Sequence, residues 1–217
     1  MNAIIFGAPG SGKGTYSALL KDKLNIDVIS MGDIFRELMK EDTNLGQTVK
    51  SYVRAGLLVP DEITLDILKQ HIAKIPKGYG FILDGFPRTL AQAQALESIA
   101  KINVVLQLVV PDWIIIERVS GRRICRNCGA VYNLQFLKPK VDEVCDKCGG
   151  SLYQRTDDNP EVIKIRLELY ECETSPLISY FKARNVPLVV HTSDRLQIPP
   201  ETVVEYFITE LKKLHLV

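Results

Sequence analysis

The sequence has almost no net charge and no long apolar run. Its 217 residues include 27 Lys and Arg against 26 Asp and Glu, so the formal net charge is +1 at pH 7. Proteins that bind nucleic acid or anionic membrane surfaces usually carry a clear positive excess, so we expect neither partner. No stretch approaches the roughly 18 apolar residues that a helix needs to span a bilayer.

Histidine is scarce, and the first residues do not form a secretory pattern. His71, His191 and His215 have no nearby partner pattern, so we expect them to be structural or exposed. The N-terminus lacks the basic and apolar regions of a signal peptide, which favours a cytoplasmic protein. In a reducing cytoplasm, paired cysteines favour metal ligation over disulfides. The apolar share of 46% is ordinary for a chain that forms one large α/β domain, or one core with insertions.

A glycine-rich stretch, residues 7–15, lies between an apolar run at residues 3–6 and a helical pattern at residues 16–24. A strand, a glycine loop and a helix in this order form a phosphate cradle, because backbone N–H groups and the helix N-terminus point at one anion. Lys13 adds a charge that can reach the outer phosphates. The spacing fits a P-loop, although Gly14 stands between Lys13 and Thr15 where Ser or Thr usually follows the lysine directly. A glycine turn with an incidental lysine is the weaker alternative.

Apolar runs alternate with helical patterns through the rest of the chain. This alternation predicts an α/β protein with a three-layer, P-loop NTPase-like fold around a parallel five-stranded sheet. After the second strand, residues 30–59 read as a helical insertion in which Asp33 is expected to cap a helix. A later helix is expected over residues 160–172. The expected strands are 3–6, 26–29, 81–84, 104–110 and 187–190.

Asp84 ends the apolar run at residues 81–84. Ligands of open α/β sheets bind at the carboxyl ends of the strands. An acid there, opposite a P-loop, is well placed to hold Mg²⁺ through water. The alternative role for Asp84 is a helix cap or a turn former.

Four cysteines occur as two Cys-x2-Cys-Gly knuckles, with 16 residues between Cys128 and Cys145. This pattern predicts one four-thiolate metal site, with zinc expected and iron left open. The alternatives are two disulfides or unrelated thiols. A segment too small for its own apolar core gains stability from such a metal. The predicted ligands are Cys125, Cys128, Cys145 and Cys148.

Arginines occur near the expected ends of several elements. Their planar guanidinium groups suit phosphate oxygens, and phosphoryl transfer consists mostly of positioning and charge neutralisation. Such a reaction needs no protein nucleophile, since a phosphate oxygen of the acceptor attacks. Singly each arginine suits the surface, but together beside a P-loop they favour a phosphate role. They are Arg36, Arg88, Arg118, Arg122, Arg123, Arg155 and Arg166.

Four stretches, residues 7–15, 83–89, 121–123 and 153–158, resemble the adenylate kinase family, and the likeness covers nearly the whole chain. It is closest to the long-lid bacterial type with a zinc-binding lid. The resemblance implies Mg²⁺-dependent transfer between ATP and AMP to give two ADP, and a monomer. It also implies a core of residues 1–29, 60–120 and 159–217, an AMP-binding insertion at 30–59 and a lid at 121–158.

The resemblance also implies which residues contact each nucleotide. Lys13, Arg88, Arg122, Arg155 and Arg166 would be catalytic. The ATP side would comprise Gly10, Ser11, Gly12, Lys13, Gly14, Thr15, Arg118, Arg122, Val131, Tyr132 and Gln197. The AMP side would comprise Met31, Arg36, Leu57, Leu58, Val59, Gly85, Phe86, Pro87, Arg88, Gln92, Arg155 and Arg166.

Two features depart from the family pattern. Met31 stands where the family usually has Thr, and it offers no useful hydrogen bond to a base. The segment of residues 192–200 is longer than the family pattern leads us to expect. A kinase for UMP or CMP is therefore the alternative enzyme, although Gln92 can pair with an adenine edge. A nucleic-acid-binding zinc ribbon is the rival from another class, but the cysteine-rich segment mixes basic with acidic residues.

Overall fold

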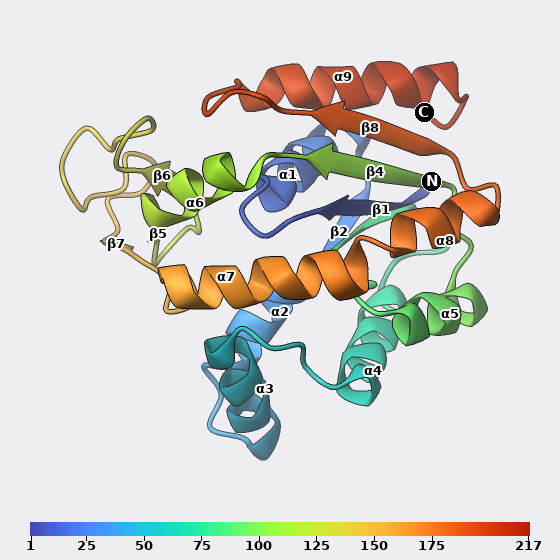
Figure 1. Cartoon of the computed structure of the whole chain (residues 1–217), viewed down its shortest axis with the longest axis horizontal. Helices are drawn as coiled ribbons and strands as arrows, with labels where there is room; N and C mark the ends of the chain where they lie inside the picture. Colours follow the sequence, from blue (N-terminus) through green and yellow to red (C-terminus); the bar gives the residue numbers. More distant parts are fainter.

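The computed structural model describes residues 1–217 and contains a five-stranded parallel sheet in the order β2-β3-β1-β4-β8 (Figure 1). Helices lie on both faces of the sheet, so the predicted α/β, P-loop NTPase-like class is confirmed. No helix combines the length and apolar character that crossing a bilayer requires. The strands are β1 (Asn2–Gly7), β2 (Asp27–Ser30), β3 (Phe81–Asp84), β4 (Val104–Val109) and β8 (Leu188–Thr192).

The helices form one layer on each face of the sheet, and one helix projects away from it. In Figure 1, α9 lies above the sheet and α7 runs below it, while α3 projects away from the sheet. The helices are α1 (Lys13–Leu24), α2 (Met31–Leu38), α3 (Asn44–Ala55), α4 (Asp61–Ile72), α5 (Leu90–Ile99), α6 (Asp112–Ser120), α7 (Pro160–Leu169), α8 (Leu177–Ala183) and α9 (Pro200–Lys213).

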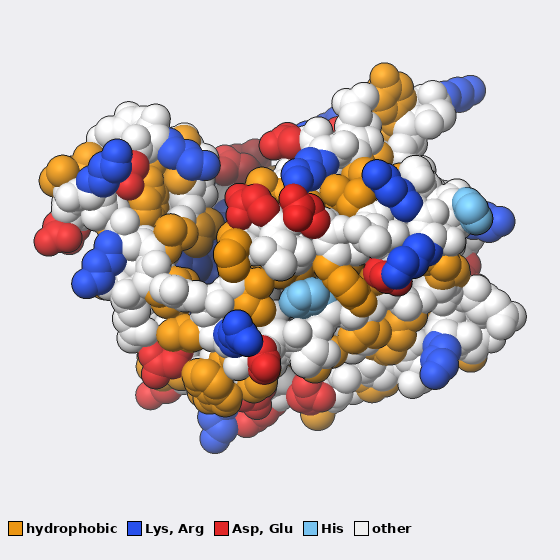
Figure 2. Space-filling model, turned by 90° about the horizontal axis from the view of Figure 1, so that it is seen from above, with side chains coloured by type: hydrophobic (Ala, Val, Ile, Leu, Met, Phe, Trp, Pro, Cys, Tyr) orange, Lys and Arg blue, Asp and Glu red, His pale blue; other side chains and the backbone are white.

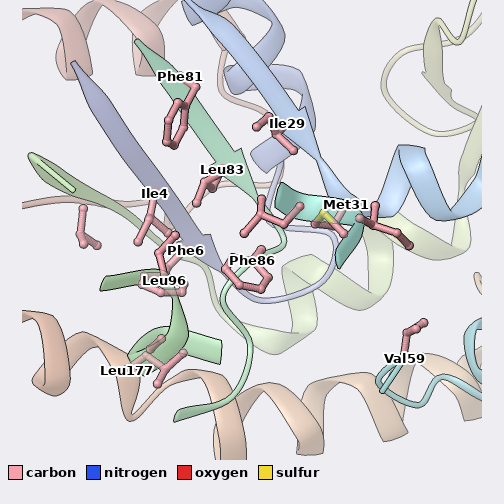
Figure 3. Close-up of a cluster of buried hydrophobic side chains, with 14 of the residues drawn as sticks. Ile4, Phe6, Ile29, Met31, Val59, Phe81, Leu83, Phe86, Leu96 and Leu177 are labelled. Carbon is pink, nitrogen blue, oxygen red and sulfur yellow. The ribbon is translucent and has the colours of Figure 1, made fainter. Parts of the chain in front are cut away.

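Strand β1 shows how the sequence builds both faces of the sheet. Ala3 and Ile5 point into one apolar cluster, which α1 and α9 complete. Ile4 and Phe6 point into the other, which contains side chains from α2, α4, α5 and α8 (Figure 3). Successive side chains of a strand face opposite sides, so an uninterrupted apolar run becomes a strand buried on both faces. This burial fixes the carboxyl end of β1, from which the glycine loop starts.

Helix α2 begins earlier than predicted. Ser30, not Asp33, is its N-cap, and the Ser30 hydroxyl accepts a hydrogen bond from the Asp33 N–H at 3.3 Å. A capping side chain accepts from the backbone N–H two or three residues ahead, which makes Asp33 a residue of the first turn. There its carboxylate pairs with Arg36. The earlier start also turns the Met31 side chain into the core (Figure 3).

The helix predicted over residues 160–172 changes geometry partway. Helix α7 ends at Leu169, and a π-helical turn, Tyr170–Thr174, continues it. The Ser175 N–H donates to the Tyr170 carbonyl at 2.7 Å, which is the wider π spacing. This turn brings the Thr174 hydroxyl to the Arg88 carbonyl at 3.0 Å.

Residues 121–158, which we call the cysteine segment, form a small sheet of their own. Its strands are β5 (Arg122–Cys125), β6 (Val131–Asn133) and β7 (Leu152–Tyr153), paired antiparallel in the order β6-β5-β7. Cys125, Tyr132 and Cys145 make its only buried apolar cluster, with two partly buried neighbours. Such a small core leaves this segment dependent on another source of stability.

Candidate functional site

The glycine loop leaves the first backbone N–H groups of α1 without a side-chain cap. Gly12 precedes the helix with φ of 102°, a left-handed conformation that glycine adopts without steric cost. A Cβ at this position would lie 2.7 Å from the Tyr16 ring, so the loop also depends on glycine for space. Gly10, Ser11, Gly14 and Thr15 belong to the same loop and first turn. These free N–H groups suit an anion.

The Lys13 ammonium lies over the loop. Its Nζ atom donates to the carbonyl oxygens of Gly7, at 2.6 Å, and Ala8, at 3.0 Å. Burial and the charges of nearby arginines together lower its pKa to about 8, against the opposing charge of Asp84. A phosphate placed here would remove much of this desolvation cost by supplying negative charge.

Asp84 lies at the carboxyl end of β3, between Ser30 of β2 and Ile5 of β1. It is 8% exposed, and a Cβ built on Gly14 would lie 3.6 Å from its Oδ2 atom. The predicted acid and the glycine loop are therefore neighbours. Burial raises the pKa of Asp84, against the opposing charges of Lys13 and Arg88. Mg²⁺ prefers oxygen ligands such as carboxylates, so Asp84 fits the predicted cation.

A cavity that is open to solvent lies beside Lys13 and Arg88. Arg88 is held from three directions: its N–H donates to Gln92 Oε1 at 2.8 Å, its carbonyl accepts from Thr174, and its Nε donates to the Gly85 carbonyl at 2.9 Å. Burial, together with the charge of Arg166, lowers its pKa to about 10, against the opposing charge of Asp84. From the predicted set, Lys13, Leu58, Gly85, Phe86, Pro87, Arg88 and Arg166 line this cavity.

Acidic residues hold several of the predicted arginines. Arg122 makes a bidentate pair with buried Asp158, with Nε 2.8 Å from Oδ2. Arg166 donates to Asp157 Oδ2 at 2.7 Å. Fixed guanidinium groups lose less freedom when they bind phosphate, so these pairs preorganise the site.

Arg155 differs from these neighbours. Its Nε atom is buried without a hydrogen-bond partner. Burial and the charges of Arg36 and Arg122 lower its pKa to about 10, against the opposing charges of Asp157 and Asp158. A buried, unpaired guanidinium N–H among like charges is costly, so this position favours an anionic ligand.

Residues predicted for the ATP side occur near the end of α6. Arg118 donates to the carbonyls of Leu196, at 3.1 Å, and Arg195, at 3.2 Å. Gln197 Nε2 donates to the Phe136 carbonyl at 3.1 Å, which links the loop before α9 to the cysteine segment. The long loop at 192–200 therefore has two anchors in this structure.

The predicted pair Val131 and Tyr132 divides between solvent and interior. The Val131 side chain is exposed, whereas Tyr132 is buried. The Tyr132 hydroxyl lies 3.4 Å from Cys145 Sγ and accepts from the Asp146 N–H at 2.8 Å. The Tyr132 hydroxyl therefore contacts the cysteine cluster.

On the predicted AMP side, the side chains also differ in how far they are exposed to solvent. Met31 is 0% exposed and Val59 is 5% exposed, and both belong to the core (Figure 3). Their side chains are packed against protein, and neither carries a group that can form a useful hydrogen bond with a base. Leu57 is exposed and Leu58 lines the cavity.

Sequence reasoning missed the groups that orient the predicted residues. These are Asp61, Asp157, Asp158 and Thr174. Asp157 and Asp158 lie within residues 153–158, one of the four stretches that resemble the family, and this was the available signal. Their partners Arg166 and Arg122 lie outside that stretch. Nothing local in the sequence pointed to Thr174 or Asp61, which act across long chain separations.

The four predicted cysteines converge. Their sulfur atoms all lie within 4.8 Å of one another, with Cys125 3.4 Å from Cys148 and Cys128 3.6 Å from Cys145. These separations far exceed the roughly 2.05 Å of a disulfide bond. They approach the spacing of about 3.8 Å that four thiolates adopt around a metal with bonds of about 2.3 Å. The cluster therefore fits a tetrahedral metal and leaves no open coordination position.

The chain is similar in sequence to several known adenylate kinases. The profile of the family "Adenylate kinase" matches residues 5–186. An adenylate kinase of Caldicellulosiruptor bescii is 48% identical over 201 residues, which cover 90% of this chain and 94% of that protein. One from Caldicellulosiruptor saccharolyticus is 50% identical, covering 86% and 89% of the two chains. One from Archaeoglobus fulgidus is 46% identical, covering 86% and 88%.

Proposed function

The chain belongs to the adenylate kinase family, and on that premise we propose how its cleft serves two nucleotides. Its activity is the reversible transfer of a phosphoryl group from ATP to AMP, which yields two ADP. The observation that carries the proposal is that Lys13, Arg88 and Arg166, from three separate parts of the chain, line one cavity. Convergent cations of this kind neutralise the charge of a phosphoryl group in transit.

The donor ATP binds at the glycine loop. The free N–H groups at the start of α1 receive its phosphates, and Lys13 exchanges its two carbonyl partners for phosphate oxygens. Arg118 and Gln197 flank the adjoining surface, where the nucleoside lies. Mg²⁺ held through water by Asp84 would neutralise phosphate charge when bound. Arg122, fixed by Asp158, lies on the side of the cysteine segment.

The acceptor AMP binds opposite the donor, between the insertion 30–59 and the Arg88 loop. Arg88 and Arg36 hold its phosphate, and Gln92 faces its base. Arg155 and Arg166 lie between the two nucleotides and stabilise the transferring group. An acceptor phosphate oxygen then attacks in line, so positioning supplies most of the rate.

We propose that the cysteine segment is a lid with a structural zinc. Cys125, Cys128, Cys145 and Cys148 would hold the ion, whose contribution is folding free energy. Adenylate kinases are themselves a standard example of a lid that closes over the reacting groups. Closure excludes water, which otherwise accepts the phosphoryl group.

Cys125→Ser should lower the thermal midpoint and make residues 121–158 sensitive to protease, because one metal ligand is lost. We expect the thermal midpoint to fall by about 5 to 10 °C. A chain of this size loses about 2 to 4 °C for each kcal/mol of lost stability, and we expect the lost ligand to cost a few kcal/mol. Metal content per chain, thermal midpoint and turnover at low temperature are the measurements. Cys172→Ser is the matched control, since Cys172 lies outside the cluster. Complete loss of activity in folded, cool Cys125→Ser would show that the metal is catalytic.

The pH dependence should report Lys13. Because burial holds its pKa near 8 in the free protein, kcat/KM for ATP should fall above about pH 8 as the ammonium deprotonates. Bound phosphates favour the ammonium, so kcat should decline only at higher pH. Lys13→Arg keeps its charge, and any residual activity should lose this alkaline limb. An unchanged limb in Lys13→Arg would assign the titration to another group.

The activity is tested by coupled assays with ATP and each of AMP, GMP, CMP and UMP. We expect AMP to give by far the highest kcat/KM, with two ADP formed per cycle. A preference for CMP or UMP would establish the alternative kinase. Nucleic acid is not expected as a partner, and Figure 2 shows basic and acidic side chains interspersed over the face it views. A salt-dependent complex with DNA or RNA would contradict that expectation.

A further inference from the structure

Asp61 joins two parts of the acceptor side that are distant in sequence. It is the first residue of α4. Its Oδ1 atom accepts from Gln92 Nε2 at 2.6 Å, and its Oδ2 atom accepts from the Thr89 hydroxyl at 3.0 Å. Thr89 is the N-cap of α5 and accepts from the Gln92 N–H. One carboxylate therefore contacts both the cap and the side chain that follows it.

These contacts fix which way the Gln92 amide points. A carboxylate only accepts, so Asp61 requires the Nε2 end of the amide. The Arg88 N–H only donates, so it requires the Oε1 end, which it contacts at 2.8 Å. Reversing the amide would place acceptor against acceptor and donor against donor. Gln92 is 2% exposed, so water is not at hand to compensate.

A fixed amide can discriminate between bases. Each end of Gln92 has one hydrogen-bonding position used by the protein and one left over: a second Nε2 hydrogen and a second Oε1 lone pair. This ordered donor and acceptor match the edge of one base, whereas a freely turning amide can match the reverse pattern too. Without Asp61 the Oε1 end of the amide keeps the Arg88 N–H, but the Nε2 end loses its protein partner. The amide is then held at one end only, so base selection should relax.

We propose that Asp61 is a positioning residue that sets acceptor specificity, because it locks the Gln92 amide and, through it, the backbone of Arg88. The inference rests on the proposed placement of AMP. It assigns Asp61 a role beyond its favourable position at the N-terminus of α4, where any carboxylate stabilises the helix. Asp61 itself does not touch the reacting groups.

The test compares Asp61→Ala, Asp61→Asn and Glu62→Ala with the wild type. Glu62 also lies in the first turn of α4 but is exposed, so its replacement is the matched control for the helix dipole. For each protein, kcat and KM are measured for AMP, GMP, CMP and UMP at saturating ATP, together with KM for ATP and the thermal midpoint. The selectivity is the ratio of kcat/KM for AMP to that for each other monophosphate.

In Asp61→Ala we expect KM for AMP to rise and the selectivity to fall by about tenfold, the effect of one lost hydrogen bond, with KM for ATP unchanged. Asp61→Asn should keep the selectivity, because its Oδ1 still accepts from Gln92 and its Nδ2 donates to Thr89. Glu62→Ala should also keep it. In a Gln92→Ala background, adding Asp61→Ala should cause no further loss of selectivity.

Unchanged selectivity in folded Asp61→Ala would overturn the proposal. So would a loss in Asp61→Asn as large as that expected for Ala, since the effect would then come from charge. If Asp61→Ala does not fold, Asp61→Leu takes its place, because leucine is close to aspartate in size and cannot accept from Gln92: a fall in selectivity supports the proposal, and unchanged selectivity overturns it. The wild type separates the two claims: if it does not prefer AMP, the proposed function fails. If it prefers AMP while the variants behave alike, only the role of Asp61 fails.

Discussion

Lys13→Met should abolish most phosphoryl transfer and leave the fold intact. We expect kcat to fall by about a thousandfold, because in the proposed placement of ATP the ammonium would be the charge closest to the donor phosphates and methionine cannot replace it. In the free protein Nζ contacts only the carbonyls of Gly7 and Ala8. Losing these contacts frees two loop carbonyls rather than disrupting the core. Turnover at saturating ATP and AMP is the measurement, with circular dichroism to check folding.

A matched control for this variant is Lys21→Met. Lys21 lies in the last turn of the same helix and makes only a 3.8 Å exposed pair with Asp27. Such a surface pair contributes little to stability, so this variant should keep wild-type turnover. Near-normal turnover in Lys13→Met would refute the assignment of the glycine loop to ATP.

Arg88→Ala should reduce kcat by about a thousandfold even at saturating AMP, because positioning of the acceptor phosphate is itself the catalysis. KM for ATP should change little. The guanidinium lines the cavity while its backbone is fixed by Gln92 and Thr174. Arg88→Lys should recover only part of the rate, since a point charge lacks the planar fork.

Arg184→Ala controls for loss of an arginine as such. Arg184 lies on the surface, stacked over Tyr180 and paired with Glu97, and does not line the cavity. It should turn over normally. If Arg88→Ala altered only the affinity for ATP, Arg88 would belong to the donor side and the proposed division of the cleft would be wrong.

Much of this fold could be predicted because its signals are local. The run at 81–84 coincides with β3, and the predicted sheet has its five strands. Strand periodicity, a glycine loop and paired cysteines each depend on residues near one another in the chain. The cysteine pattern also predicted that the four thiols would converge, and in the structure they do. Two Cys-x2-Cys knuckles at this spacing are typical of a metal site.

The parts that could not be predicted depend on tertiary contacts. The capping role of Ser30 and the π-helical turn at Tyr170–Thr174 each depend on how a helix end meets the core. Met31 has a side chain that suits either a ligand or an interior, and only packing decides between them. The Asp61–Gln92 hydrogen bond spans 31 residues, and no periodicity marks such a pair.

The most direct measurement is a crystal structure with a bisubstrate ligand in which two adenosines are joined through five phosphates. We expect Lys13 Nζ to leave the carbonyls of Gly7 and Ala8 and to contact the phosphates at the start of α1. Arg88 should hold the phosphate at the opposite end of the chain of five, and Arg155 Nε should gain a partner. If Lys13 kept its carbonyl contacts, or if Arg88 did not touch the ligand, the proposed division of the cleft between ATP and AMP would be contradicted.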